Sequence, residues 1–405
     1  MTNKLSIHQL PLQGEKVLLR VDFNVPLSPE GKITDDTRIR EALPTIQYIL
    51  KQGGSVILMS HLGRPKGKKD PQFSLAPCQK RLSELLGIPV LFAPDCVGPQ
   101  AETMAEALLP GQVLMLENLR FYPAEEDPDS DPSFAQKLAK LGDLYVNDAF
   151  GTAHRKHAST ASIAHYFPGK RAVGLLMEKE IAFFDRMLTN PKRPFYALIG
   201  GAKIGTKLGV LSSLVSKVDA LFIGGGMAFT FLKAQGIAVG DSLVDDDDAC
   251  LAHAKELLKS NKIHLPKDLL IADAFKADAA IRVISVEEGI PKGWQGMDIG
   301  PQTVREWAQA FQKAKTVFWN GPVGVFEFPR FGKGTEEMAT AIAALNATTV
   351  VGGGDSVAAV NACHLADRFS HVSTGGGASL EYIEFGHLPG IDAVFENLNA
   401  KPQSR

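Results

Sequence analysis

Basic side chains that could bind an anion recur in the first half of the chain. Each lies at or just beyond the end of a short apolar stretch, or in the loop that follows it. The guanidinium group of arginine donates two parallel hydrogen bonds to phosphate or carboxylate, and histidine adds a further donor or a positive charge. Together these groups predict a site for a small molecule with several negative charges; the alternative is that they are solvated side chains of surface loops. The residues are Arg38, His61, Arg64, Arg120 and Arg155.

Two polar residues, Asp22 and Asn24, follow the first of these apolar stretches, residues 17–21. Asp22 offers hydrogen-bond acceptors, and Asn24 offers both an acceptor and a donor. Beside an anion site, such groups either bind hydroxyls of the ligand or hold the arginines in position. The predicted ligand is therefore small, carries several negative charges and has at least one hydroxyl.

Glycines and lysines follow the apolar stretches in the second half of the chain. The segment 200–207 (GGAKIGTK) begins where a strand is expected to end and a helix to start. Glycine lets the backbone approach phosphate closely, and the N-terminus of a helix presents free N–H groups to an anion. Lys203 and Lys207 are four residues apart, so on a helix they share one face. The chain contains neither a Walker A loop nor a G-x-G-x-x-G fingerprint.

The segment 352–356 (GGGDS) predicts another anion-binding turn, in which Asp355 could meet a phosphate-bound Mg²⁺. The segment 320–324 (NGPVG) and Glu327 would suit a wall for the base and ribose, with Glu327 accepting hydrogen bonds from ribose hydroxyls. Close packing would explain any one glycine triplet. Several triplets at successive strand ends, together with two lysines and an aspartate, favour a nucleotide site.

The sequence contains no recognisable motif for a catalytic nucleophile. Neither a G-x-S-x-G elbow nor an H-E-x-x-H pair is present. This absence fits phosphoryl transfer between two bound substrates, in which the protein positions groups and neutralises charge.

The elements that must position these residues alternate between short apolar stretches and amphipathic segments such as 76–86 and 247–258. This alternation predicts α/β architecture with parallel sheets, whose ligands bind at the carboxyl ends of the strands. Met177, Ile181, Phe184 and Leu188 recur at helical spacing, and Asn190-Pro191 would end that helix. We interpret it as a helix connecting two domains; the alternative is a crossover helix within one sheet.

Length and composition bound the remaining possibilities. A chain of 405 residues predicts two domains, and a net charge of −2 argues against general binding to nucleic acid or membranes. The four cysteines are far apart and fit free thiols in a reducing compartment.

Because the N-terminus fits no signal peptide and the apolar run 220–232 is too short to span a bilayer, we expect a cytoplasmic protein. The acidic run 245–248 is expected to cap the following helix; a metal site is the alternative.

With these residues assembled, the chain resembles phosphoglycerate kinases nearly end to end. The motifs that carry the resemblance are RVDFNVP (20–26), SHLGRP (60–65), ENLRF (117–121), NDAFGTAHR (147–155), GGAK (200–203), WNGPVGVFE (319–327), GGGDS (352–356) and STGGGAS (373–379). The resemblance implies two Rossmann-like lobes, each a parallel sheet flanked by helices, joined by a connecting helix. Residues 1–175 would bind 3-phosphoglycerate, with 389–405 packing back on them, and 176–388, including the connecting helix, would bind the nucleotide.

The resemblance also implies the reaction and the role of each residue. A phosphoryl group would pass directly, after the lobes close, between 1,3-bisphosphoglycerate and ADP, giving 3-phosphoglycerate and ATP in glycolysis or gluconeogenesis. Mg²⁺ would accompany the nucleotide, and the family leans towards monomers. Arg38, Lys203 and Lys207 would be catalytic, and Asp355 would face the metal. The substrate-binding set would be Asp22, Phe23, Asn24, Arg38, His61, Leu62, Gly63, Arg64, Arg120 and Arg155. The nucleotide-binding set would be Gly201, Ala202, Lys203, Lys207, Gly225, Asn320, Pro322, Glu327, Gly353, Gly354, Asp355 and Ser356.

The chain departs from the family pattern at two places. Ile204-Gly205-Thr206 stands where members often carry Val-Ser-Asp, and Ser356 often appears as threonine. Ser356 keeps the hydroxyl, whereas Thr206 lacks a charge. Two rival interpretations are a carboxylate kinase of another fold and a non-catalytic nucleotide-binding relative.

Overall fold

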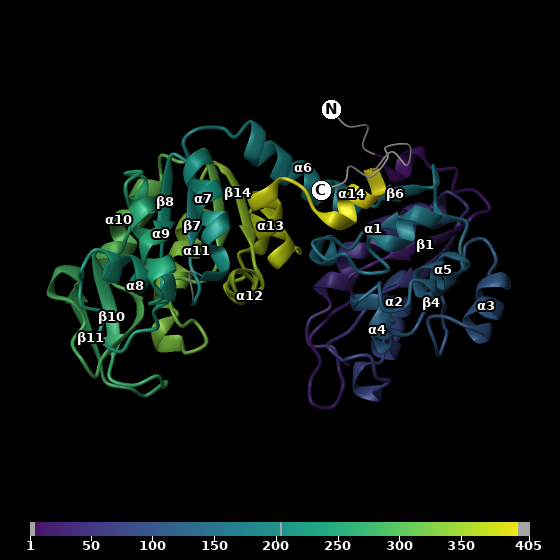
Figure 1. The fold of residues 1–405 in the computed structure, drawn as a ribbon, viewed down its shortest axis with the longest axis horizontal. Coiled ribbons are helices and arrows are strands. Elements are labelled where there is room, and N and C mark those ends of the chain that lie inside the picture. Colours follow the sequence, from purple (N-terminus) through teal and green to yellow (C-terminus); the bar gives the residue numbers. More distant parts are fainter. Residues whose placement is uncertain (1–4, 203–204, 396–405) are drawn as a thin grey trace. The chain divides into compact units, whose positions relative to one another are not determined.

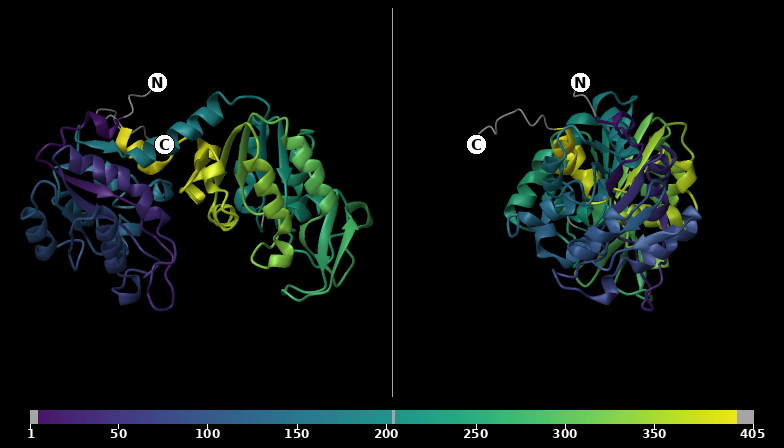
Figure 2. Two further views of the ribbon diagram at one scale, coloured as in Figure 1. Left: turned by 180° about the vertical axis from the view of Figure 1, so that it is seen from behind. Right: turned by 90° about the vertical axis from the view of Figure 1, so that its right-hand side faces the viewer.

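The computed structural model describes residues 5–202 and 205–395, which form two compact units. Within the described residues, unit 1 comprises 5–182 and 387–395, and unit 2 comprises 183–202 and 205–386. Each unit contains a six-stranded parallel sheet with helices against it, as the ribbon views show (Figures 1 and 2). The prediction of α/β architecture with parallel sheets is therefore confirmed.

The sheet of unit 1 has the strand order β3-β4-β2-β1-β5-β6, with Val17 of β1 opposite Val56 of β2 and Leu144 of β5. Its central strands are buried on both faces, as parallel strands covered by helices must be. The strands are β1 (Lys16–Arg20), β2 (Ser55–Met59), β3 (Val90–Phe92), β4 (Val113–Met115), β5 (Leu144–Asn147) and β6 (Arg171–Val173). The helices are α1 (Thr37–Lys51), α2 (Ala76–Leu86), α3 (Pro99–Glu106), α4 (Pro123–Glu126), α5 (Ser133–Ala139) and α14 (Pro389–Phe395), with short 3₁₀ turns that include η3 (Leu119–Phe121) and η4 (Phe150–Thr152).

Helix α14 returns from the far end of the chain to unit 1. The N–H of Gly390 donates to the carbonyl of Ala153 over 2.8 Å, and the side chain of Asn147 donates to the carbonyl of Gly390 over 3.2 Å. The buried guanidinium of Arg171 donates to the carbonyl of Val394 over 3.0 Å. The rest of the segment expected to pack here, residues 396–405, lies outside the described residues.

The main sheet of unit 2 has the strand order β15-β14-β13-β7-β8-β9. Its strands are β7 (Phe195–Ile199), β8 (Ala220–Ile223), β9 (Ile263–His264), β13 (Thr316–Asn320), β14 (Thr348–Gly352) and β15 (His371–Val372). The helices are α7 (Leu208–Lys217), α8 (Gly225–Ala234), α9 (Asp248–Leu258), α10 (Pro301–Phe311), α11 (Lys333–Ala343), α12 (Gly354–Ala362) and α13 (Gly377–Phe385), and the 3₁₀ turn η6 (Gly205–Lys207) precedes α7.

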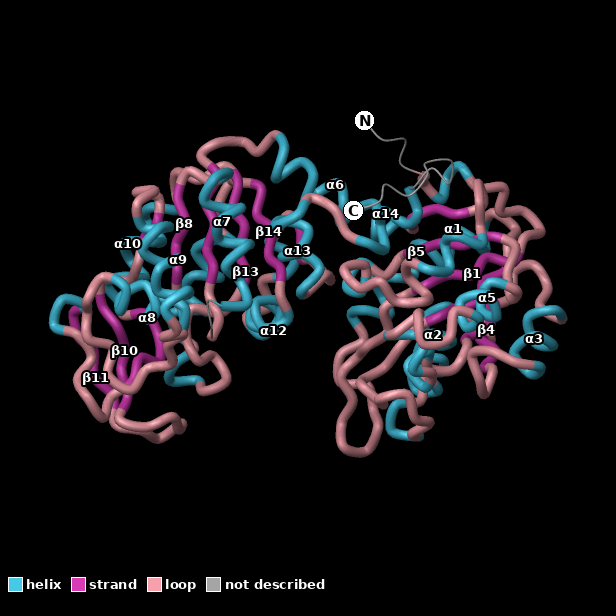
Figure 3. Tube along the Cα trace, viewed as in Figure 1, coloured by secondary structure: helices cyan, strands magenta, loops and turns pink. Residues whose placement is uncertain are grey.

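Unit 2 also contains a three-stranded antiparallel sheet that the sequence pattern did not reveal. Its order is β11 (Ile281–Ser285), β10 (Asp268–Ala272) and β12 (Gln295–Ile299), and Figure 3 shows its strands apart from the main sheet. One face of this sheet packs Leu269 and Ile271 against Phe229 of α8. The antiparallel sheet therefore packs against helix α8 within unit 2.

Helix α6 (Leu175–Thr189) connects the two sheets, and the boundary between the compact units falls inside it, after Ala182. Its start belongs to unit 1, where the carboxyl of buried Asp148 accepts the N–H of Met177 over 3.0 Å. Its end belongs to unit 2, where the ring of Phe183 stacks on His371 with centroids 4.5 Å apart. The expected boundary, before residue 176, lies at the start of this helix.

The acidic run before α9 caps that helix. The carboxylate of Asp247 accepts the N–H of Cys250 over 2.9 Å, so the capping interpretation is confirmed. Among the described residues, no group of three histidines, cysteines or acidic residues could hold a metal ion. Within the same residues, no helix is long and apolar enough to cross a membrane.

Candidate functional site

The predicted basic residues of unit 1 gather at the carboxyl ends of neighbouring strands. Residues after β4, β2, β1 and β5 meet there because these four strands are adjacent in the sheet. His61 follows β2, Arg120 lies in η3 after β4, and Arg155 follows η4 after β5. Arg38 comes from the first turn of α1. The topology thus brings together positions that are up to 117 residues apart in sequence (38 to 155).

Asp22 lies at the centre of this group. It forms an ion pair with Arg38, and its carboxylate is 4.0 Å from Nδ1 of His61. Burial alone would raise the pKa of the Asp22 carboxyl, but the neighbouring guanidinium groups, Arg38 first and then Arg20, outweigh it and hold the pKa well below its usual range. Asp22 therefore stays ionised and orients the cations around it.

His61 is 3% exposed and is held by Arg20, whose guanidinium lies 3.2 Å from Nδ1 of the ring. Burial lowers the pKa of His61 well below its usual value; Asp22 opposes this shift, and the neighbouring arginines add to it. His61 is therefore neutral despite its proximity to Asp22, so one ring nitrogen donates and the other accepts.

The loop after β2 is fixed by polar contacts to its main chain. The N–H of Gly63 donates to the side-chain oxygen of Asn24 over 2.9 Å, and the guanidinium of Arg120 donates to the carbonyl of Gly63 over 2.8 Å. Asn118 donates to the carbonyl of Leu62 over 2.8 Å. Gly63 has φ +61° and lies against the ring of Phe73, so a side chain there would be strained and crowded. Arg64, the next residue of this loop, is exposed to solvent.

Arg155 is exposed and follows η4, in the loop after β5. Its Nε donates to Nε2 of His154 over 3.0 Å. The buried ring of His157 has its pKa lowered to about 3, first by burial and then by Arg20, Arg120 and Arg155. His157 is therefore a neutral ring, and its Nδ1 lies 3.9 Å from the buried carboxylate of Glu125.

Three contributors to this region were missed from the sequence: Arg20, His154 and His157. Arg20 is fully buried at the end of β1, where its Nε donates to the hydroxyl of Ser159 over 2.9 Å. The same hydroxyl donates to the buried carboxylate of Glu125 over 2.6 Å. A charged residue that ends an otherwise apolar strand is the signal that could have identified Arg20.

In unit 2, the predicted phosphate segment follows β7 and is held by its neighbours. The N–H of Gly200 donates to the carbonyl of Asn320 over 2.8 Å, and that of Gly201 donates to the carbonyl of Pro322 over 2.9 Å. A Cβ at Gly225, which has φ +62°, would lie 2.8 Å from the amide nitrogen of Gly201. Gly225 is therefore required by the packing of the backbone. Lys203 lies outside the described residues.

Lys207 anchors the far end of this segment. Its ammonium donates to the carbonyl of Gly200 over 2.8 Å and to the side-chain oxygen of Asn320 over 3.0 Å. Burial lowers the pKa of Lys207 to about 8, and Asp355 opposes the shift. The side chain is thus a mostly charged donor near neutral pH, beside the predicted phosphate segment.

Asp355 and Ser356 lie in the first turn of α12, which begins at Gly354, two residues after β14 ends. The Ser356 hydroxyl accepts the N–H of Gly321 over 2.5 Å, so this serine holds the loop after β13. Asp355 is exposed at the helix start and lines the pocket described next. Gly353, with φ +95°, lies against the side-chain amide of Asn320.

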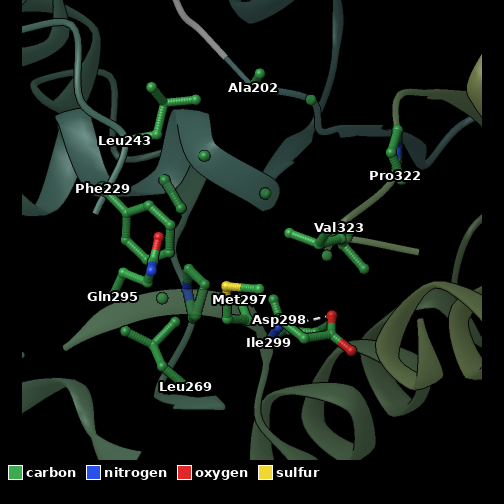
Figure 4. Close-up of a pocket in the computed structure, with 18 of the residues that line it drawn as sticks. Ala202, Phe229, Leu243, Leu269, Gln295, Met297, Asp298, Ile299, Pro322 and Val323 are labelled. Atoms are coloured by element: carbon green, nitrogen blue, oxygen red, sulfur yellow. Dashed lines mark hydrogen bonds between the residues drawn. The ribbon is translucent and has the colours of Figure 1, made fainter. Parts of the chain in front are cut away.

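A cavity of about 230 Å³ opens beside these loops in unit 2 (Figure 4). Several predicted nucleotide-binding residues line it: Gly201, Ala202, Gly225, Pro322, Glu327 and Asp355. In the close-up, Phe229 and Leu243 lie across the space from Val323, with Met297 between them. Apolar walls of this kind suit a flat ring, and the glycines leave room for it.

Comparisons with known proteins show the family of the chain. The sequence model for "Phosphoglycerate kinase" matches residues 7–385. The chain belongs to the phosphoglycerate kinase family. Its relatives include the phosphoglycerate kinase of Moorella thermoacetica, 54% identical over 97% of this chain and 99% of the relative. The cytosolic phosphoglycerate kinase of Triticum aestivum is 53% identical over 98% of this chain and 100% of its own length.

Solved structures of phosphoglycerate kinases have the same fold. The Coxiella burnetii enzyme matches with a TM-score of 0.83 at 40% identity, covering 96% of this chain and 98% of that one. The Pyrococcus horikoshii enzyme matches with a TM-score of 0.85 at 32% identity, with the same coverage. The phosphoglycerate kinase fold therefore extends over both units.

The apolar walls of the cavity were not predicted from the sequence. Phe229, Leu269 and Met297 line it, and all three are buried. In the sequence they are indistinguishable from core residues, because lining a pocket and filling a core demand the same side chains. Pairing between β10 and β12 brings the last two together, and no local pattern reports that pairing.

Proposed function

We propose that the chain catalyses reversible phosphoryl transfer between 1,3-bisphosphoglycerate and ADP, giving 3-phosphoglycerate and ATP. One observation carries the proposal. In a chain matched by the phosphoglycerate kinase family, unit 1 gathers arginines around neutral, buried His61, while unit 2 places buried Lys207 among glycines beside an apolar cavity. The first arrangement suits a small polyanion and the second a nucleotide.

In unit 1, the glycerate substrate would be bound mainly by arginine forks. Arg64 is exposed and free to turn towards a phosphate, whereas Arg120 is fixed by its hydrogen bond to Gly63. Ionised Asp22 would accept a hydrogen bond from the substrate hydroxyl, and neutral His61 would donate one to the substrate carboxylate. The remaining proposed contacts are Phe23, Asn24, Leu62, Gly63 and Arg155.

In unit 2, the apolar cavity would bind the base. Glu327, which lines the cavity, would accept hydrogen bonds from ribose hydroxyls. The phosphates would lie along the glycines and Lys203 and Lys207. Asp355 is an exposed carboxylate at the start of α12, which is the kind of single protein ligand that a nucleotide-bound Mg²⁺ takes. When bound, Mg²⁺ would neutralise negative charge on the phosphates.

Transfer would be direct and in line. The carboxylate oxygen of 3-phosphoglycerate attacks the γ-phosphorus of ATP, the bond to the β–γ bridging oxygen breaks, and ADP leaves. Arg38, Lys203 and Lys207 would neutralise charge on the transferring group, so the protein supplies position and electrostatics rather than a covalent intermediate.

The proposal requires the two units to bring their ligands together during turnover. Direct transfer needs reacting atoms about 3–3.5 Å apart, and water must be excluded or ATP would be hydrolysed. Small-angle X-ray scattering on free protein and on the ternary complex with a non-transferable ATP analogue tests this step. We expect a smaller radius of gyration in the complex; equal values would contradict closure.

A coupled assay of ATP consumption tests the activity itself. We expect rapid turnover with 3-phosphoglycerate and none above background with acetate or aspartate. Turnover on acetate or aspartate would favour another carboxylate kinase, and nucleotide binding without turnover would favour a non-catalytic relative. We further propose a cytoplasmic monomer in glycolysis or gluconeogenesis; light scattering after size exclusion tests the oligomeric state.

A further inference from the structure

Asp245 holds the phosphate segment of unit 2 from a distant part of the chain. Its Oδ2 accepts the N–H of Gly205 over 2.8 Å. Gly205 is the first residue of η6, and Lys207 is the last. The N–H groups at the start of a helical turn have no partner within the turn, so a carboxylate is well suited to bind one. The contact spans 40 residues of sequence.

Asp245 is itself anchored to the wall of the cavity. Its main-chain N–H donates to the hydroxyl of Thr230 over 3.1 Å, and Thr230 is 1% exposed within α8. Two residues later, Asp247 caps α9. The segment that carries Asp245 is therefore fastened to α8 on one side and to α9 on the other.

Helix α8 also contacts the start of the phosphate segment directly. The N–H of Met227 donates to the carbonyl of Gly201 over 3.1 Å. The next two residues of α8, Ala228 and Phe229, line the cavity. The contacts from Thr230 to Asp245 and from Asp245 to Gly205 add a second connection. Helix α8 is thus connected to the phosphate segment both at Gly201, near its start, and at Gly205, further along it.

We infer that Asp245 is a positioning residue for the nucleotide phosphates. It does not line the cavity, and it acts by fixing the turn that carries Lys207 relative to α8. This inference rests on the proposed function. Without the tie, the η6 turn would sample more conformations, and ordering it would have to accompany each binding event.

The test compares three variants. Asp245→Ala should lower kcat/KM for ATP about 5- to 30-fold, the range expected for loss of a helix-capping contact, with KM for 3-phosphoglycerate unchanged. Asp245→Asn keeps an oxygen acceptor and should recover most of the loss. Asp246→Ala is the matched control, because the Asp246 side chain is 73% exposed and its partner, Lys233, lies 3.7 Å away on the surface. It should behave like the unchanged protein.

Calorimetric titration with ADP supplies a readout that needs no turnover. Affinity should fall in Asp245→Ala and recover in Asp245→Asn, while the thermal midpoint stays close to that of Asp246→Ala. Unchanged ADP affinity in Asp245→Ala, or an equal loss in Asp245→Asn, would overturn the inference. If the unchanged protein binds ADP but fails to phosphorylate 3-phosphoglycerate, the proposed function fails while the ADP comparison still tests Asp245.

Discussion

The two units handle negative charge with different parts of the polypeptide. In unit 1 the site consists of side chains that hold one another, as Asp22 holds Arg38 and Arg20 holds His61. In unit 2 it consists mainly of main chain, where Gly200, Gly225 and Gly226 lie too close to neighbouring main-chain atoms for a Cβ. A side-chain site is damaged by removing atoms, whereas a main-chain site is damaged by adding them.

Burial acts on a basic group in each unit, with opposite consequences. His61 is kept neutral, because its ordinary pKa is already near neutrality and burial lowers it further. Lys207 begins from a much higher pKa, so a shift to about 8 leaves most of it charged at pH 7. The same desolvation thus yields a neutral hydrogen-bonding group in unit 1 and a cation in unit 2.

The largest effect is expected from truncating the side-chain site. Arg38→Ala should lower kcat by about 10²- to 10⁵-fold, because it removes a cation proposed to neutralise the transferring group. Arg40→Ala is the control on the same helix, since the Arg40 side chain is 52% exposed and pairs with Asp36 at the surface. Steady-state kinetics of both variants measure this difference in kcat. A near-normal kcat of Arg38→Ala would contradict a role for Arg38 in the mechanism.

Removing an arginine that binds ground-state substrate should affect one ligand only. Arg120→Ala and Arg64→Ala should each raise KM for 3-phosphoglycerate by about 10- to 100-fold, as expected for a hydrogen bond to a charged group, and leave KM for ATP nearly constant. Arg120→Ala should also lower the thermal midpoint, because Arg120 supports Gly63 and pairs with Glu126 at 3.2 Å. A selective rise in KM for ATP would mean that the two units were assigned the wrong ligands.

Adding one methyl group should damage the main-chain site. A Cβ at Gly226 would overlap the carbonyl oxygen of Ala202, so Gly226→Ala should weaken ADP binding by about 1–3 kcal/mol through displacement of the loop. At Gly352 the nearest atoms to an added Cβ are 3.6 Å away, on Ser379, so Gly352→Ala serves as the control. Calorimetric titration compares them; similar ADP affinities would contradict the main-chain interpretation.

The smallest effect concerns pH. Lys207 loses its charge as pH rises through about 8, so kcat/KM for ATP should fall on the alkaline side with that pKa. Lys207→Arg keeps the charge at higher pH, so its kcat/KM for ATP should begin to fall only at a higher pH, even if its overall rate is lower. A limb that stays at about pH 8 in Lys207→Arg would assign the titration to another group.

Much of the fold and of the proposed site followed from local sequence. Short apolar stretches such as 17–21 and 195–199 ended in polar or glycine-rich turns, and parallel α/β topology made those turns neighbours. The capping role of Asp247 also needed only sequence, because a cap acts on its own helix. A local pattern is sufficient to predict a candidate site residue when a residue of the right type directly follows a strand.

The sequence by itself determined which residues could bind anions and that parallel strands would present them. Only the tertiary structure decided which groups are buried together: Arg20 with His61, the cavity walls Phe229 and Met297, and Asp245 with the phosphate segment. These contacts join residues far apart in the chain. Their energies depend on desolvation and on pairing between distant elements, neither of which leaves a local periodicity in the sequence.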